Sequence, residues 1–162
     1  MNLVGEYIIG APREAVWSAV NRVDLLRASI PGCQEIHEQE DGRLRAVVKL
    51  KIGVVTATLR GIVSLEDVQA PVSYTIVGEG EGGVAGFVRG TSHVRLDETD
   101  SATTKLSFDV DAKVGGKLAS VGGRLLDATA KKLANQFFEN FRAALIAEGV
   151  ARPLEIQPSP GA

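Results

Sequence analysis

Residues 113–138 read KVGGKLASVGGRLLDATAKKLANQFF, and the hydrophobic period of the chain changes within this stretch. Before Gly115-Gly116, apolar and polar residues alternate, which is the pattern of half-buried β-strands. From about Lys117 to Glu148, apolar residues recur at helical spacing instead. The sequence therefore predicts a β-sheet that is followed by one long C-terminal helix.

The chain before this stretch is predicted to form seven strands. Leu3 to Ile9 forms the first, and two short helices follow it, opened by Ala11-Pro12-Arg13-Glu14 and by Asp24-Leu25-Leu26. Six alternating stretches then lie at about residues 33–39, 44–51, 57–65, 72–76, 88–96 and 106–114. Because the connections between these stretches are short, they are expected to pair as an antiparallel meander. The predicted fold class is α+β, with a curved antiparallel sheet of about seven strands wrapped around the long C-terminal helix.

Length and composition indicate one globular domain. The chain has 162 residues, of which 44% are hydrophobic and 23% are charged, and its net charge is −2. Residues 1–148 are assigned to this domain, and residues 149–162, which include three prolines, are expected to form a disordered C-terminal tail. Cys33 is the only cysteine, so no internal disulfide is expected.

The same composition argues against several functional classes. The sequence has no arginine-rich stripe for a nucleic acid, and no apolar run of about 18 residues for a membrane span, so a cytoplasmic location is expected. The stretch Gly78–Gly86 lacks the Lys-Ser/Thr ending of a nucleotide-binding loop. His37 and His93 are interpreted as surface histidines, and no HExxH pair or carboxylate cluster predicts a metal site. The residues nominate neither a catalytic group nor a metal ligand.

Glycine-rich, apolar loops are predicted to gather at one end of the sheet. Successive turns of a meander alternate between its two ends, and one end receives Ile30-Pro31-Gly32, Ile52-Gly53-Val54, Gly80–Gly86 and Gly115-Gly116. Each glycine taken alone is explained as readily by a tight turn. Together they favour a pliable entrance to a cavity between the curved sheet and the long helix.

Eleven residues are predicted to line this cavity or its mouth. Phe137, Phe138 and Phe141 are expected to fill the core beside the second half of the helix, which leaves its first half free to line the cavity. Inward hydroxyl groups such as that of Tyr7 would orient a carbonyl group of an apolar ligand. The predicted residues are Ile30, Pro31, Tyr74, Val84, Phe87, Ser92, Phe108, Leu118, Val121, Leu125 and Thr129.

Two stretches carry a resemblance to a known family. They are Ala28–Cys33 (ASIPGC), and Lys113–Ala119 (KVGGKLA) with its continuation through Gly123–Leu133 (GRLLDATAKKL) to Gln136–Phe138 (QFF). Both resemble the CoxG family of carbon monoxide dehydrogenase, which is part of the SRPBCC, or START-like, superfamily, and the likeness covers about residues 1–148. The resemblance implies a helix-grip fold.

The resemblance also implies a function. It indicates a non-catalytic accessory protein of a molybdenum-containing dehydrogenase, located at the inner face of the bacterial cytoplasmic membrane. Its partners would be the molybdenum hydroxylase subunits, and its ligand a respiratory quinone or a lipid held without a covalent bond in the grip cavity. Lys51, Lys113, Lys117 and Arg124, near the glycine-rich end, would meet anionic lipid head groups in a peripheral membrane contact.

Two alternatives stay open at the level of sequence. START-like folds also host cyclases and hydrolases, which would require an acid–base pair that points into the cavity. A docking subunit without a ligand would instead have a cavity filled by side chains.

Overall fold

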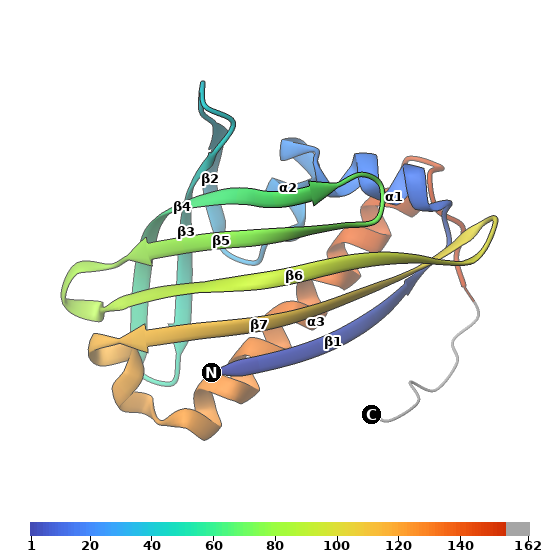
Figure 1. Cartoon of the computed structure of the whole chain (residues 1–162). Coiled ribbons are helices and arrows are strands. Elements are labelled where there is room, and N and C mark those ends of the chain that lie inside the picture. Colours follow the sequence, from blue (N-terminus) through green and yellow to red (C-terminus); the bar gives the residue numbers. More distant parts are fainter. Residues whose placement is uncertain (155–162) are drawn as a thin grey trace.

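An antiparallel sheet forms the main layer of the computed structural model, which describes residues 1–154 (Figure 1). Its strands are β1 (Asn2–Ile9), β2 (Cys33–Glu38), β3 (Leu44–Ile52), β4 (Val55–Gln69), β5 (Ser73–Glu81), β6 (Phe87–Asp100) and β7 (Thr103–Gly115). Across these described residues the seven strands lie in the order β1-β7-β6-β5-β4-β3-β2. The predicted meander from β2 to β7 is confirmed, and β1 pairs antiparallel with β7.

Two short helices follow β1, and one long helix follows β7, as predicted. The α-helices are α1 (Arg13–Val20), α2 (Val23–Ser29) and α3 (Gly123–Ala147), and the short 3-10 helices are η1 (Gly83–Ala85) and η2 (Gly116–Val121). The long helix begins at Gly123 and not near Lys117, because η2 comes first and Gly122 has a φ of 92°, which interrupts the right-handed helix. Within residues 1–154, no helix combines the length and the apolar character needed to cross a lipid bilayer.

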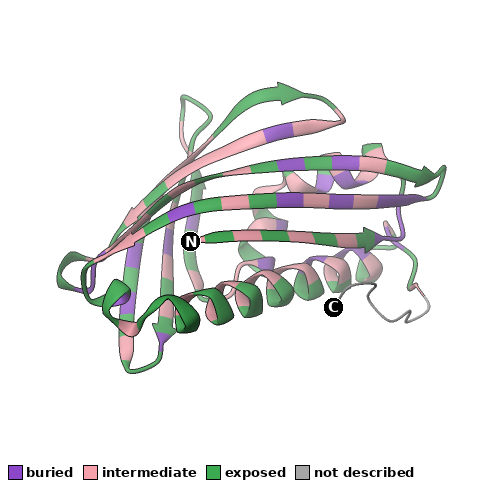
Figure 2. Ribbon diagram, turned by 60° about the horizontal axis from the view of Figure 1, so that its bottom comes forward, coloured by how far each residue is buried: buried purple, intermediate pink, exposed green. Residues whose placement is uncertain are grey.

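The hydrophobic core is divided into two clusters. The larger one joins the second half of α3 to α1, α2 and strands β1, β6 and β7, and it fully buries Phe141 and Leu145 of the helix. The smaller one lies near the turn between β3 and β4, beside η1 and η2. Its buried members are Ile52, Ala57, Leu59, Ala85 and Leu118. Residues 123–135 of α3, between the two, are half-buried or exposed (Figure 2), so the helix is anchored mainly by its second half.

The domain extends past the boundary expected at residue 148. Ala151 is buried in the larger cluster, and the backbone N–H of Arg152 donates to the carbonyl oxygen of Gly10 at 2.9 Å. The Arg152 guanidinium also donates to the Thr103 hydroxyl at 2.6 Å and to the Ala102 carbonyl. Residues 149–154 therefore fasten the chain beyond α3 to the ends of β1 and β7. The rest of the expected tail, residues 155–162, lies outside the described residues.

Candidate functional site

An apolar cavity of about 350 Å³ lies on the concave face of the sheet. It is lined by residues from β3 to β7. These are Ala46, Val48, Leu50, Leu59, Gly61, Val63, Ile76, Gly78, Glu79, Gly80, Val88, Gly90, Thr91, Ser92, Val110 and Ala112. The volume falls in the range of about 300–1,000 Å³ that is typical of small-molecule sites. The cavity is therefore large enough for a small molecule or for part of a longer lipid.

The cavity exists because small residues line the middle of the sheet. In the cross-strand register, Ala46 lies opposite Gly61, which lies opposite Gly80. A second row runs through Gly78, Gly90 and Ala112. A strand that packs against a helix ordinarily presents large apolar side chains to it. These two rows present none, so the space between the two core clusters stays unfilled.

The glycines in these rows differ in the room around them. A Cβ atom at Gly61 would lie 2.6 Å from the carbonyl oxygen of Glu79, and one at Gly90 would lie 2.4 Å from that of Asp111. Backbone atoms cannot give way to such contacts, so both positions require glycine. At Gly78 and Gly80 the nearest atoms would be 3.4 and 3.5 Å away, which is ordinary van der Waals contact. A side chain at either of these positions would project into the cavity.

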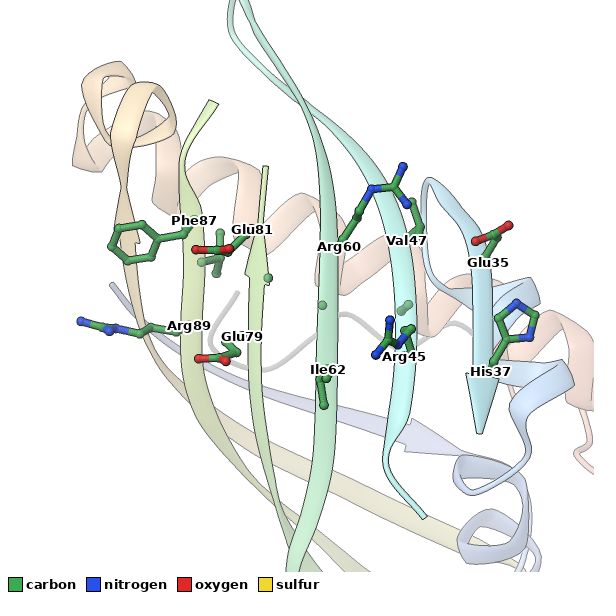
Figure 3. A pocket seen from close by; sticks show the side chains of 14 residues that line it. Glu35, His37, Arg45, Val47, Arg60, Ile62, Glu79, Glu81, Phe87 and Arg89 are labelled. Atoms are coloured by element: carbon green, nitrogen blue, oxygen red, sulfur yellow. The ribbon is translucent and has the colours of Figure 1, made fainter. Parts of the chain in front are cut away.

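The cavity offers few polar side-chain groups. Ser92 lies on the same strand face as Val88 and Gly90, which places its hydroxyl on the cavity side. Glu79 is the one titratable residue among the described residues that line the cavity, and its carboxylate points to the opposite face of the sheet (Figure 3). An apolar wall with one inward hydroxyl suits a lipophilic ligand that carries a hydrogen-bonding group.

The structure places the eleven predicted residues in several environments. Ser92 lines the cavity. Tyr74 and Phe108 are buried in the larger core cluster, where the Tyr74 ring meets Trp17 edge to face at a centroid distance of 5.4 Å. Burial raises the pKa of Tyr74 to about 12, so its hydroxyl is protonated at neutral pH. Ile76 and Val110 line the cavity and also pack against this cluster, so Tyr74 and Phe108 help to close one end of the cavity.

Other predicted residues close the opposite end or lie apart from the cavity. Leu118 is buried in the smaller cluster and Val121 packs against it. Phe87 lies on the outer face of the sheet (Figure 3), since its neighbour Val88 lines the cavity and successive side chains of a strand alternate. The remaining five do not line the cavity: Val84 and Leu125 are exposed, and Ile30, Pro31 and Thr129 are half-buried.

One hydroxyl named from the sequence has a defined partner. The Tyr7 hydroxyl donates to the side-chain oxygen of Asn135 on α3, and the Tyr7 ring stacks on Phe138 at a centroid distance of 4.0 Å. Burial is the main cause of the raised pKa of Tyr7, and the nearby Glu139 carboxylate adds to it. Tyr7 therefore helps to hold α3 against β1.

The expected entrance at the glycine-rich end is packed with side chains. Along β3, the cavity residue Leu50 is followed by Ile52 of the smaller cluster and then by the exposed Gly53-Val54 turn. The same order holds along β4. The smaller cluster therefore lies between the loop tips and the cavity, and a ligand that enters from this end has to displace it.

The loop tips at this end are apolar and flanked by basic residues. Val54 is 97% exposed and Val84 is 83% exposed, and Leu125 at the start of α3 is exposed beside Gly53. The neighbouring basic side chains are exposed as well. They are Lys51, Lys117 and Arg124. We refer to Val54, Val84 and Leu125 as the apolar tips.

Comparisons with known proteins agree with this architecture. The family model for CoxG, a subunit of carbon monoxide dehydrogenase, matches residues 5–146. A solved structure of a conserved protein from Geobacillus kaustophilus is 27% identical, with a TM-score of 0.86, and the match covers 94% of this chain and 98% of that one. A search of curated proteins found no match.

Two more distant structures bear on the fold alone. A START superfamily protein from Mycobacterium smegmatis is 14% identical, with a TM-score of 0.68, over 90% of this chain and 97% of that one. The Zhui aromatase/cyclase from Streptomyces sp. R1128 is also 14% identical, with a TM-score of 0.65, over 89% of this chain and 92% of that one. The predicted START-like fold is confirmed.

Proposed function

Because the chain belongs to the CoxG family of carbon monoxide dehydrogenase, we propose that it binds a respiratory quinone or a lipid and serves a molybdenum-containing dehydrogenase as an accessory protein. The observation that carries the proposal is the unfilled apolar cavity, whose wall consists of residues such as Gly61, Gly80 and Val110. Transfer of about 250 Å² of apolar ligand surface out of water contributes about 6 kcal/mol before the costs of binding. The Ser92 hydroxyl would donate a hydrogen bond to a ring carbonyl.

The unfilled volume favours a ligand carrier over the other two hypotheses. A docking subunit without a ligand has no use for about 350 Å³ of empty apolar space. A cyclase or hydrolase needs an acid–base pair, whereas Ser92 has no titratable side chain beside it on the cavity face of the described residues.

Extraction of the purified protein tests the proposal. The protein is expressed in a bacterium that makes both ubiquinone and menaquinone, purified without detergent, and extracted with organic solvent for mass spectrometry. We expect a quinone or another lipid in a substantial fraction of the molecules. The proposal is contradicted if the extract contains neither and if the protein also shows no saturable binding of an added short-chain quinone.

The proposed function includes a peripheral contact with the membrane at the glycine-rich end. The apolar tips are exposed side by side with Lys51, Lys117 and Arg124, a combination that suits an anionic lipid surface. Valine side chains at Val54 and Val84 would enter the interfacial region while the basic groups meet lipid head groups. This orientation brings the smaller core cluster, and the cavity behind it, close to the source of the ligand.

A further inference from the structure

A second hollow, of about 610 Å³, lies on the outer face of the sheet, across β2 to β6 (Figure 3). One cross-strand row at this site runs from Glu35 on β2 through Val47 and Arg60 to Glu81 and Phe87. Five strands at a spacing of about 4.8 Å span about 19 Å, which is the length of a helix of about 13 residues. We refer to this site as the outer hollow.

The charged side chains of the outer hollow are available to a partner. Three arginines and three glutamates line it, and none of the six takes part in a salt bridge among the described residues. Glu81 lies directly opposite Arg60 in the strand register, and Glu79 lies opposite Arg89. Exposed ion pairs contribute little to stability, so redirecting these groups toward a bound molecule costs little.

The floor of the outer hollow is apolar. Val47 is buried and Ile62 is half-buried, and the half-buried Phe87 ring carries the Arg89 guanidinium 5.4 Å from its centroid. Arginine and aromatic side chains around a partly apolar floor are typical of the energetically important part of protein–protein interfaces. A lipophilic molecule would have to desolvate the charged groups without compensating them, so the composition favours a protein segment.

We propose that the outer hollow docks the molybdenum-containing dehydrogenase. The docked segment would have an apolar ridge over Val47 and Ile62, acidic groups facing Arg45 and Arg60, and basic groups facing Glu79 and Glu81. The identity of the partner rests on the proposed function, whereas the chemistry of the segment follows from the outer hollow.

The position of the outer hollow fits a protein that joins an enzyme to a membrane. It lies on the convex side of the strands whose concave side lines the cavity, and backbone at Gly61 and Gly80 borders both. Val54 and Val84, at the end of the molecule, do not line it. The enzyme and the membrane would therefore contact separate surfaces, and the ligand would lie one sheet thickness from the docked enzyme.

The test is the affinity of the intact dehydrogenase complex, purified from the organism that encodes this chain, for immobilised variants of the full chain. The double variant Arg45→Glu/Arg60→Glu should bind at least about thirtyfold more weakly than the unaltered protein, and Glu79→Lys/Glu81→Lys should also weaken binding. Lys131→Glu/Lys132→Glu, which makes the same change in net charge on the exposed side of α3, is the matched control and should change the affinity less than twofold. Higher salt should slow association with the unaltered protein.

Quinone binding, measured on the same samples, separates this proposal from the ligand-binding function. We expect the outer variants to bind quinone as the unaltered protein does, which also shows that they are folded. Enzyme binding that is unchanged in both outer variants would overturn the docking site and leave the carrier function intact. A protein that binds quinone but no dehydrogenase would overturn the docking proposal together with the partner assignment. Dehydrogenase binding without quinone binding would instead overturn the carrier function.

Discussion

Filling the cavity through Gly78→Val/Gly80→Leu should raise the dissociation constant of a short-chain quinone at least about fiftyfold, which is about 2.4 kcal/mol. The new side chains would occupy the space that the ligand needs, and a close-packed sheet does not readily make room for both. Neither glycine has a positive φ, and a Cβ atom at either position meets ordinary contacts. Since glycine weakens a strand, we expect the free energy of unfolding to be unchanged or slightly higher.

The measurement is calorimetric titration of the quinone, with urea unfolding of the same samples. The matched control is Val77→Leu, on the same strand next to Gly78 but facing away from the cavity. It should bind quinone as the unaltered protein does. Affinity of the double variant within threefold of that of the unaltered protein, with the fold intact, would place the ligand somewhere other than this cavity.

Val54→Asp/Val84→Asp should lower the partition of the protein onto anionic vesicles about a hundredfold. Burial of each valine in the lipid interface contributes about 1.5 kcal/mol, and two such contributions correspond to about two powers of ten. The introduced carboxylates add repulsion from the anionic surface. Flotation with vesicles of phosphatidylglycerol and phosphatidylcholine measures the change, and added salt should weaken the binding of the unaltered protein.

The far end of the sheet supplies the control for the membrane contact. Leu65 and Val68, 42% and 53% exposed, lie near the end of β4 that is remote from the apolar tips. Leu65→Asp/Val68→Asp therefore makes the same chemical change at the other end of the molecule. Equal losses in both double variants would show a general loss of surface hydrophobicity, and unchanged binding of the tip variant would refute the proposed orientation.

Most of the fold follows from the spacing of apolar residues. Alternation along β3, β4, β6 and β7 sets which face is buried, and short turns leave antiparallel pairing as the simple arrangement. The start of α3 was harder to predict, because the apolar spacing runs through Leu118 and Val121 of η2 without a break. The φ of Gly122 sets the boundary, and the sequence there shows only two adjacent glycines.

The cavity was predicted in general but not in its lining. Large apolar residues and hydroxyl groups were the expected lining, and several of them, such as Tyr74, Phe108 and Leu118, proved to fill the ends of the concave face. The missing signal was glycine at inward strand positions, as at Gly78 and Gly80, where no turn needs it. Phe87 could have been placed on the outer face from its alternation with Val88.

The most direct test of the lipophile-binding cavity is a ¹⁵N–¹H correlation spectrum of the labelled protein during titration with a short-chain naphthoquinone. Glycine amides are well suited to this because they resonate in a distinct region of the spectrum. We predict that the largest shifts fall on Gly78, Gly80, Gly90 and Ser92, and that they saturate at one ligand per protein. Shifts confined to residues of the outer hollow such as Arg45 and Arg60, or no saturable shift at all, would contradict ligand binding in this cavity.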